Sequence, residues 1–300
     1  MKSTVIAKLI AALSLVIIFC TLAAAEEQRR VTLVVLPCSD EVSTITKFSP
    51  LVKYLREETG FEFKISVATS AAEFDNRVKN GDFEFVLQDP NTYVSYARFF
   101  QQDSLLSALN GNGEALQQGI VIARKDRGIT KIEDLRGKSV MFGNELSAAK
   151  WVAARELFEE HGIDIDKDLR SRTVGGCCED IAFNVYLGAV DAGVVCAHFL
   201  SEHSEKQKEL GVKVDALVTV GTTRPVPERV FAAHRKTERA VVEKVVHALL
   251  KLDRRSPEFE VILSRAELSG FRRATDREYD IMRVRPGAKP KSPVYKLAPQ

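Results

Sequence analysis

The sequence predicts an α/β fold made of two lobes with a ligand cleft between them. Short apolar runs alternate with amphipathic segments of helical period, a pattern typical of a parallel sheet covered by helices on both faces. The alternation begins near residue 31, begins again after Gly119, and is interrupted at residues 224–227. We therefore expect the chain to cross between two units twice, so that its C-terminal part completes the first lobe. Ligands of such folds bind at the carboxyl ends of the strands.

Each predicted strand is a short apolar run, and several predicted helices stop at a glycine, which readily ends a helix. The predicted strands are 31–36, 63–67, 83–87, 120–123, 139–142, 190–195 and 214–220. The predicted helices are 48–59, 71–79, one from about 91, 148–161, one from about 179 to 187, and 236–252. The expected domains are a first lobe over 26–122, a second lobe over 123–222, the rest of the first lobe over 223–285, and a tail over 286–300.

Residues 1–25 have the layout of a cleavable secretory signal peptide. Lys2 and Lys8 precede an apolar run, and small alanines lead to an expected cleavage after Ala25. The alternatives are a membrane anchor, for which the apolar run is short, and a lipid on Cys20, which the bulky Phe19 disfavours. We expect a protein exported to the periplasm.

Composition excludes some classes of function. The about 275 residues left after cleavage allow one large domain or two lobes, and they carry equal numbers of basic and acidic side chains. No basic block is interleaved with aromatic residues, so we expect no nucleic-acid partner. We also expect a monomer without a cofactor.

The most informative stretch is residues 175–193, GGCCEDIAFNVYLGAVDAG. A glycine pair ends a strand, and Glu179 and Asp180 fall in the first turn of the next helix, where acidic side chains suit the helix dipole. A glycine-rich turn before a helix exposes backbone N–H groups and so makes a ready anion site. Here the thiols of Cys177 and Cys178 stand at its mouth.

The order and spacing of several segments resemble one known family. The chain is similar to periplasmic substrate-binding proteins of phosphate, phosphite and phosphonate ABC transporters, which have the two-lobed type II binding-protein fold. The segments that carry the resemblance are 48–55 (FSPLVKYL), 85–94 (FVLQDPNTYV), 122–143 (IARKDRGITKIEDLRGKSVMFG), 161–164 (HGID), 190–195 (VDAGVV) and 270–283 (GFRRATDREYDIMR). The resemblance implies that the lobes close on a small oxyanion. It also implies a membrane partner, either an ABC permease or a sensor kinase.

The resemblance also places candidate ligand contacts. Asn91, Thr92 and Tyr93 stand where the family contacts its ligand with backbone N–H and aromatic groups, although Asn91 could equally be a helix cap. Phosphonate binders carry Ser-Thr-Ser-Gly where this chain has residues 147–150, SAAK, so Ser147 keeps a hydroxyl while two others are lost. Lys150 could supply charge in their place or could point into solvent.

Cysteines replace other family features. Cys177 and Cys178 stand in place of Ser-His, and Cys196 stands near an acidic position of the family. Cys38, beside Ser39, lies in the loop after the first strand, which the family opens to the cleft. The resemblance thus gathers four thiols and the Ser39 hydroxyl around one cleft.

Three interpretations of these cysteines stay open. The first is a disulfide, for which Cys196 with Cys177 or Cys178 is the most plausible pair, because adjacent cysteines pair poorly. The second is a soft-ligand site, in which Cys38, Cys177, Cys178 and Cys196 hold a metal ion or arsenite, as in a cysteine-bearing sensor branch of the family. The third is that the cysteines are buried and inert.

A cysteine-dependent enzyme is the least favoured class. Cys177 or Cys178 at a helix N-terminus could be a nucleophile, but only His198 lies near in sequence as a base. No metalloprotease, phosphate-loop or dinucleotide motif is present.

Overall fold

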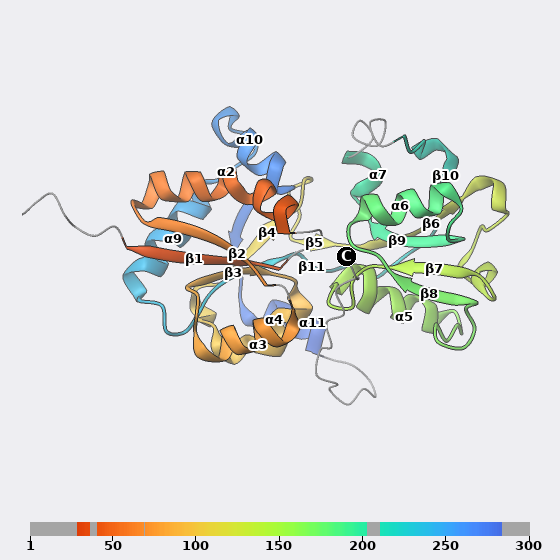
Figure 1. The fold of residues 1–300 in the computed structure, drawn as a ribbon, viewed down its shortest axis with the longest axis horizontal. Helices are drawn as coiled ribbons and strands as arrows, with labels where there is room; N and C mark the ends of the chain where they lie inside the picture. The colour runs from red at the N-terminus through yellow and green to blue at the C-terminus, as the bar shows by residue number, and fades with distance from the viewer. Residues whose placement is uncertain (1–28, 37–40, 69, 203–210, 284–300) are drawn as a thin grey trace, which may run out of the picture.

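The computed structural model describes residues 29–36, 41–68, 70–202 and 211–283. These residues form two lobes that lie side by side (Figure 1). The first lobe has a six-stranded sheet in the order β13-β4-β12-β3-β1-β2, and the second a five-stranded sheet in the order β10-β6-β9-β7-β8. A short antiparallel ribbon of β5 (Leu116–Gln117) and β11 (Val226–Pro227) carries the chain between them. The second sheet starts at Gly119, before the boundary expected after residue 122.

The first sheet is mixed in direction. Its strands are β1 (Arg30–Val35), β2 (Glu62–Val67), β3 (Phe85–Gln88), β4 (Leu106–Leu109), β12 (Val230–Ala233) and β13 (Gly270–Arg273). β1 pairs in parallel with β2 and β3, whereas β12 lies antiparallel between β3 and β4. A parallel sheet was predicted, and that was wrong for the returning strands. β12 enters from the ribbon without the helical crossover that a parallel strand needs.

Helices cover both faces of the first sheet (Figure 1). They are α2 (Glu41–Thr59), α3 (Ala71–Asn80), α4 (Pro90–Tyr96), α9 (Arg239–Lys251), α10 (Pro257–Ala266) and α11 (Asp280–Arg283). Successive side chains of β1 point to opposite faces of the sheet. Leu33 packs with α2, α9 and α10 on one face, and Val34 packs with α3 and α4 on the other. The helix expected from residue 48 begins earlier, at Glu41, and includes Pro50.

The second sheet is mixed too. Its strands are β6 (Gly119–Arg124), β7 (Ser139–Phe142), β8 (Ser171–Val174), β9 (Ala192–Cys196) and β10 (Leu217–Thr222). Its helices are α5 (Ala153–Glu160), which continues a π-helical turn (Ala148–Val152), α6 (Cys178–Leu187) and α7 (Phe199–Glu202). β7 pairs in parallel with β8 and β9, and β6 lies antiparallel between β9 and β10. The strand expected over 214–220 starts later, after a short 3-10 turn.

A close approach between α6 and β9 depends on one glycine. A Cβ atom on Gly193 would lie 2.5 Å from Ile181 Cγ2 and 2.9 Å from Val185 Cγ2, so only glycine lets the helix pack this close to the strand. The approach brings Cys178, at the start of α6, to Cys196, at the end of β9. Within the described ranges, no helix has both the length and the apolar character that a bilayer span requires.

Candidate functional site

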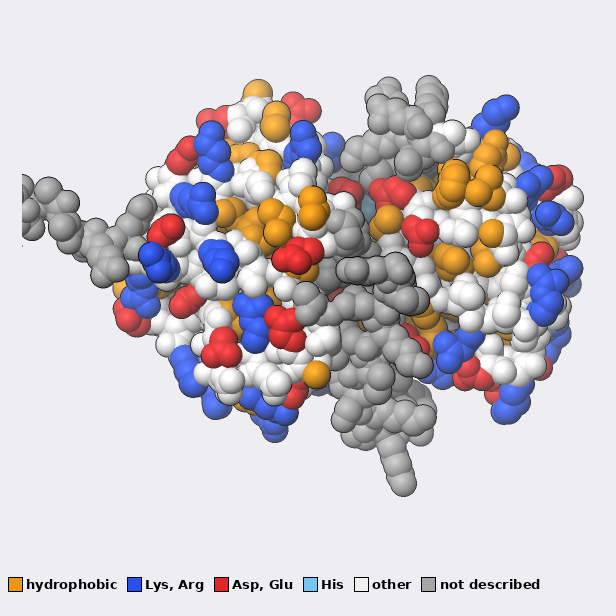
Figure 2. Space-filling view, viewed as in Figure 1, with side chains coloured by type: hydrophobic (Ala, Val, Ile, Leu, Met, Phe, Trp, Pro, Cys, Tyr) orange, Lys and Arg blue, Asp and Glu red, His pale blue; other side chains and the backbone are white. Residues whose placement is uncertain are grey.

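A cavity lies between the lobes at the carboxyl ends of β1, β3, β7 and β8, where the sequence predicted the ligand cleft. It encloses about 920 Å³ of atom-free space, its open mouth included. Its lining is Val35, Leu36, Thr44, Lys47, Phe48, Ala68, Ser70, Leu87, Gln88, Asp89, Thr92, Asn144, Leu146, Ser147, Lys150, Gly176 and Arg229. On the face in Figure 2, acidic and basic side chains are interspersed over both lobes. The charged residues of the cavity lining are Lys47, Asp89, Lys150 and Arg229.

The first-lobe wall contains buried polar groups that find no hydrogen-bond partner among the described residues. Gln88 is 1% exposed and Thr92 is 2% exposed. Within the part of the chain that the structure describes, neither the amide oxygen and nitrogen of Gln88 nor the hydroxyl of Thr92 makes a hydrogen bond. Each such group left unpaired costs about 1–3 kcal/mol, which a bound ligand with matching donors and acceptors would recover. Thr92 was predicted as a contact, whereas Gln88 was not singled out. Its only sequence signal is an amide that ends an otherwise apolar strand.

The second-lobe wall presents a buried lysine. Lys150 is 5% exposed, and its Nζ donates to the Gly176 carbonyl at 3.2 Å. The Ser147 hydroxyl lines the cavity and caps this helical turn by accepting from the Lys150 amide at 3.2 Å. Gly143 makes room for the lysine, since a Cβ there would lie 2.5 Å from Lys150 Cβ. Of the two placements that the sequence left open, the structure has Lys150 in the cleft.

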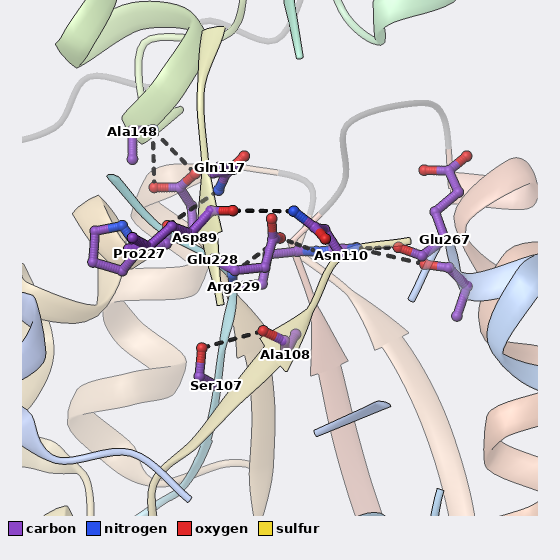
Figure 3. Close-up of polar contacts among 12 residues, drawn as sticks. Asp89, Ser107, Ala108, Asn110, Gln117, Ala148, Pro227, Glu228, Arg229 and Glu267 are labelled. Atoms are coloured by element: carbon purple, nitrogen blue, oxygen red, sulfur yellow. Dashed lines mark hydrogen bonds and ion pairs between the residues drawn. The ribbon is translucent and has the colours of Figure 1, made fainter. Parts of the chain in front are cut away.

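Asp89 links the two lobes. Its Oδ1 accepts from the Asn91 amide at 2.8 Å, which caps α4, and both carboxyl oxygens lie 3.1 Å from the Ala148 amide of the other lobe (Figure 3). Burial raises the pKa of Asp89 to about 7, and the nearby Glu228 adds to the rise while Lys150 opposes it. A carboxylate therefore occupies the helix N-terminus near Ser147, where the sequence predicted that a ligand oxyanion would bind.

A second acidic group lies close to this contact. Glu228 is 4% exposed, and its Oε1 accepts from Arg229 Nε at 3.3 Å (Figure 3). Arg229 also donates to the Glu267 carbonyl, and it lines the cavity together with Lys47, which pairs with the Glu267 carboxylate. Among the described residues of the lining, the basic side chains are Lys47, Lys150 and Arg229, and acidic side chains pair with Lys47 and Arg229.

Three cysteines lie close to the turn at Gly176, which lines the cleft. Cys177 and Cys178 follow Gly176 in the chain, and Cys196 is the last residue of β9. The Cys196 amide donates to Cys178 Sγ at 3.2 Å, and the two thiols are hydrogen-bonded to each other. This contact lowers the pKa of Cys178 and raises that of Cys196, and Lys150 further favours the Cys178 thiolate. Burial instead raises the pKa of Cys177 to about 12. All three are free thiols.

The four-cysteine set predicted for a soft ligand is not complete in the described residues. Cys38 and Ser39 lie outside them. Among the residues that are described, no group of three or more His, Cys, Asp or Glu side chains is placed to hold a metal ion. The thiols that come together are the two of Cys178 and Cys196.

Tyr93 and Asn91 differ from their expected placement. Tyr93 is fully buried in the first lobe, where its hydroxyl donates to Asp276 Oδ1 at 2.7 Å and its ring packs on Tyr279. One step along α4 from Thr92 turns the Tyr93 side chain into the core, and its contact with a ligand stays a prediction. Asn91 is not part of the cavity lining, and the helix cap is Asp89.

Comparisons with known proteins identify relatives of the whole fold. The family model described as "ABC transporter, phosphonate, periplasmic substrate-binding protein" matches residues 33–279. A binding protein of a phosphonate ABC transporter from Pseudomonas aeruginosa superposes with a TM-score of 0.74 at 15% identity, covering 86% of this chain and 85% of that one. PhnD1 of Prochlorococcus marinus, solved with methylphosphonate, gives 0.73 at 15% identity, with 85% and 96% covered. These likenesses confirm the two-lobed fold.

A curated relative comes from Salmonella typhimurium. The tetrathionate sensor histidine kinase TtrS is 24% identical over 228 residues, which are 72% of this chain. The match spans 38% of the length of that relative.

Proposed function

Because the chain belongs to the family of periplasmic substrate-binding proteins of phosphonate ABC transporters, we propose that it captures a small oxyanion in the cleft between its lobes. The family predicted from the sequence is confirmed, and it is a family of substrate-binding proteins rather than enzymes. The family is periplasmic.

The observation that carries the oxyanion proposal is the Asp89 contact. A carboxylate resembles one face of a phosphonate, and here it is held by the Ala148 amide beside the Lys150 ammonium. In the proposed complex, a ligand oxygen replaces Asp89 at this amide. Lys150 supplies charge from the second lobe, while Gln88 and Thr92 supply neutral hydrogen bonds from the first.

Ligand contacts from both lobes make closure the recognition event. An oxyanion bound to Ala148 and Lys150 of one lobe and to Gln88 of the other favours the closed population, because only that population makes all of these contacts. The membrane partner then distinguishes the closed from the open form. We propose an ABC permease as that partner, in keeping with the family.

Calorimetric titration of the protein lacking residues 1–25 tests the proposal. We expect methylphosphonate, phosphite or phosphate to bind, and Lys150→Met to weaken the binding about 10–100-fold, since a hydrogen bond to a charged group contributes about 1.5–3 kcal/mol. Lys213→Met, which removes an exposed lysine of the same lobe, is the matched control and should bind as the wild type does. Equal affinity of the two variants, or no binding of these anions, would refute the proposal.

A second candidate is the sensing of a thiol-reactive ligand, and the Cys178–Cys196 contact favours it. The sequence predicted arsenite for such a site. The similarity to a tetrathionate sensor kinase adds tetrathionate as a second candidate ligand. Unlike arsenite, this anion contains S–S bonds. The partner in this case would be a sensor kinase. Arsenite or tetrathionate should then act on the reduced protein, and Cys178→Ser should abolish the response while Cys177→Ser preserves it.

Export and assembly are further parts of the proposal. We propose that the leader, which lies outside the described residues, is removed after Ala25 and that the protein is a monomer. N-terminal sequencing of periplasmic material and its mass by light scattering test the two points. A retained leader or a dimer mass would contradict them.

A further inference from the structure

We propose that Cys178 and Cys196 form a thiol–disulfide exchange site, in which Cys178 attacks a reagent that contains an S–S bond and Cys196 then closes an intramolecular disulfide. The site lies outside the cavity lining and does not depend on which anion the cleft binds. It deepens the second candidate function by naming the nucleophile, the resolving thiol and the class of reagent.

The fold holds the two sulfurs together. Cys178 is the first residue of α6 and Cys196 the last of β9, and the Cys196 amide lies 3.2 Å from Cys178 Sγ. The fully buried side chains of Ile181 and Val185 pack α6 against Gly193, which fixes the helix on the strand. The Cys196 amide contact places Cys196 directly against Cys178 Sγ, so a disulfide bond of about 2.05 Å would join two residues that the fold already holds in contact.

The environment assigns the two roles. Three features stabilise a thiolate on Cys178: the hydrogen bond from the Cys196 thiol, the Cys196 amide and the positive charge of Lys150. Burial opposes this stabilisation, and Glu179 opposes it more weakly. Cys196 keeps its proton because it is the donor of the shared hydrogen bond and because Cys178 and Glu228 disfavour a second negative charge. Cys178 is therefore the nucleophile and Cys196 the resolving thiol.

Cys177 is excluded from both roles. Its thiol stays protonated near neutral pH because burial raises its pKa to about 12. A disulfide between Cys177 and its direct neighbour Cys178 would also require strained geometry. Both members of the proposed pair are half-buried, so they are packed against the core but keep part of their surface in solvent.

The chemistry balances for a reagent such as tetrathionate. The Cys178 thiolate attacks an inner sulfur, a new S–S bond forms on Cys178, and the broken bond releases thiosulfate. Cys196 then loses its proton to solvent and attacks Cys178 Sγ, which expels the second half as thiosulfate. The two thiols lose two electrons, and the reagent accepts both. The event is stoichiometric, since nothing in the scheme returns the disulfide to thiols.

Peptide mapping after oxidation tests the pairing. The reduced protein, carrying Cys38→Ser so that this thiol does not compete, is treated with tetrathionate or, separately, with oxidised glutathione. Free thiols are then alkylated. We expect a Cys178–Cys196 cross-link and an alkylated Cys177, and Cys177→Ser should cross-link at the wild-type rate. A cross-link with either reagent supports the proposal, and the faster reagent identifies the preferred source of the S–S bond.

Two variants separate the roles. In Cys196→Ser the reaction with the S–S reagent should stop at a stable mixed adduct on Cys178, because the resolving thiol is missing. Cys178→Ser should react with the reagent at least tenfold more slowly than the wild type. The Cys196→Ser result stands even if the Cys178 variant folds poorly. A cross-link through Cys177, or a native protein that forms no Cys178–Cys196 bond with either reagent, would overturn the proposal.

Discussion

Replacing Asp89 with asparagine should stabilise the unliganded protein above neutral pH. The carboxyl group has a pKa of 3.8 in the unfolded chain and about 7 in the fold, where burial disfavours its charge. Below about pH 4 it is protonated in both states and contributes nothing. As the pH rises from 4 to 7, the unfolded chain releases the proton that the fold retains. Folding therefore becomes less favourable, and the full penalty applies above pH 7.

The penalty can be bounded from the pKa. A rise from 3.8 to about 7 corresponds to about 4 kcal/mol, at 1.36 kcal/mol for each unit of pKa. Asp89 keeps part of its surface exposed, so we expect about half of that, or about 2 kcal/mol. Asp89→Asn removes the charge, and its amide oxygen can still accept from Ala148. The variant should therefore melt about 4–8 °C higher than the wild type at pH 8 and at nearly the same temperature at pH 4.

Melting temperatures of both proteins from pH 4 to 8 check this expectation. His234 acts in the opposite direction, since burial lowers its pKa and its contribution is lost as the pH falls. It is common to both proteins and cancels in their difference. Phosphite affinity at pH 8 should also rise about tenfold in the variant, because the anion no longer competes with a carboxylate. A lower melting temperature at pH 8, or a difference that does not change with pH, would refute this reasoning.

Three further substitutions separate cleft from core. Gly143→Ala should weaken anion binding about tenfold in the same titrations, because its Cβ would displace Lys150; unchanged affinity would contradict this. Thr92→Val should raise the free energy of unfolding by about 1 kcal/mol in urea while weakening ligand binding, since its hydroxyl has no hydrogen-bond partner among the described residues and is expected to serve only the complex; a loss of stability would argue against that role. Tyr93→Phe should lower the free energy of unfolding by about 1 kcal/mol, because the hydrogen bond to Asp276 is lost, and should leave anion affinity unchanged. A loss of anion affinity would indicate that Tyr93 contacts the ligand.

The sequence predicted the lobes because their central strands are continuous apolar runs, as in Val31–Val35 of β1. The glycine pair at 175–176 indicated only where β8 ends, and the sequence provided no bounds for that strand, because its residues Ser171–Val174 are all exposed at the sheet edge and form no apolar run. Thr92 and Tyr93 could not be separated, because one residue of helix rotation decides which of them faces the cleft. The contact between Asp89 and Ala148 joins residues 59 positions apart in different lobes, so only the folded chain brings them together.

The discontinuity of the first lobe has a consequence for how the chain is made. All strands of the second sheet lie between Gly119 and Thr222, so this sheet can assemble as soon as that stretch has emerged. The first sheet lacks its inner strand β12 until Val230–Ala233 arrives, and its edge strand β13 comes later still. The half of the molecule that is synthesised first is therefore completed last, and it exposes open strand edges during that interval.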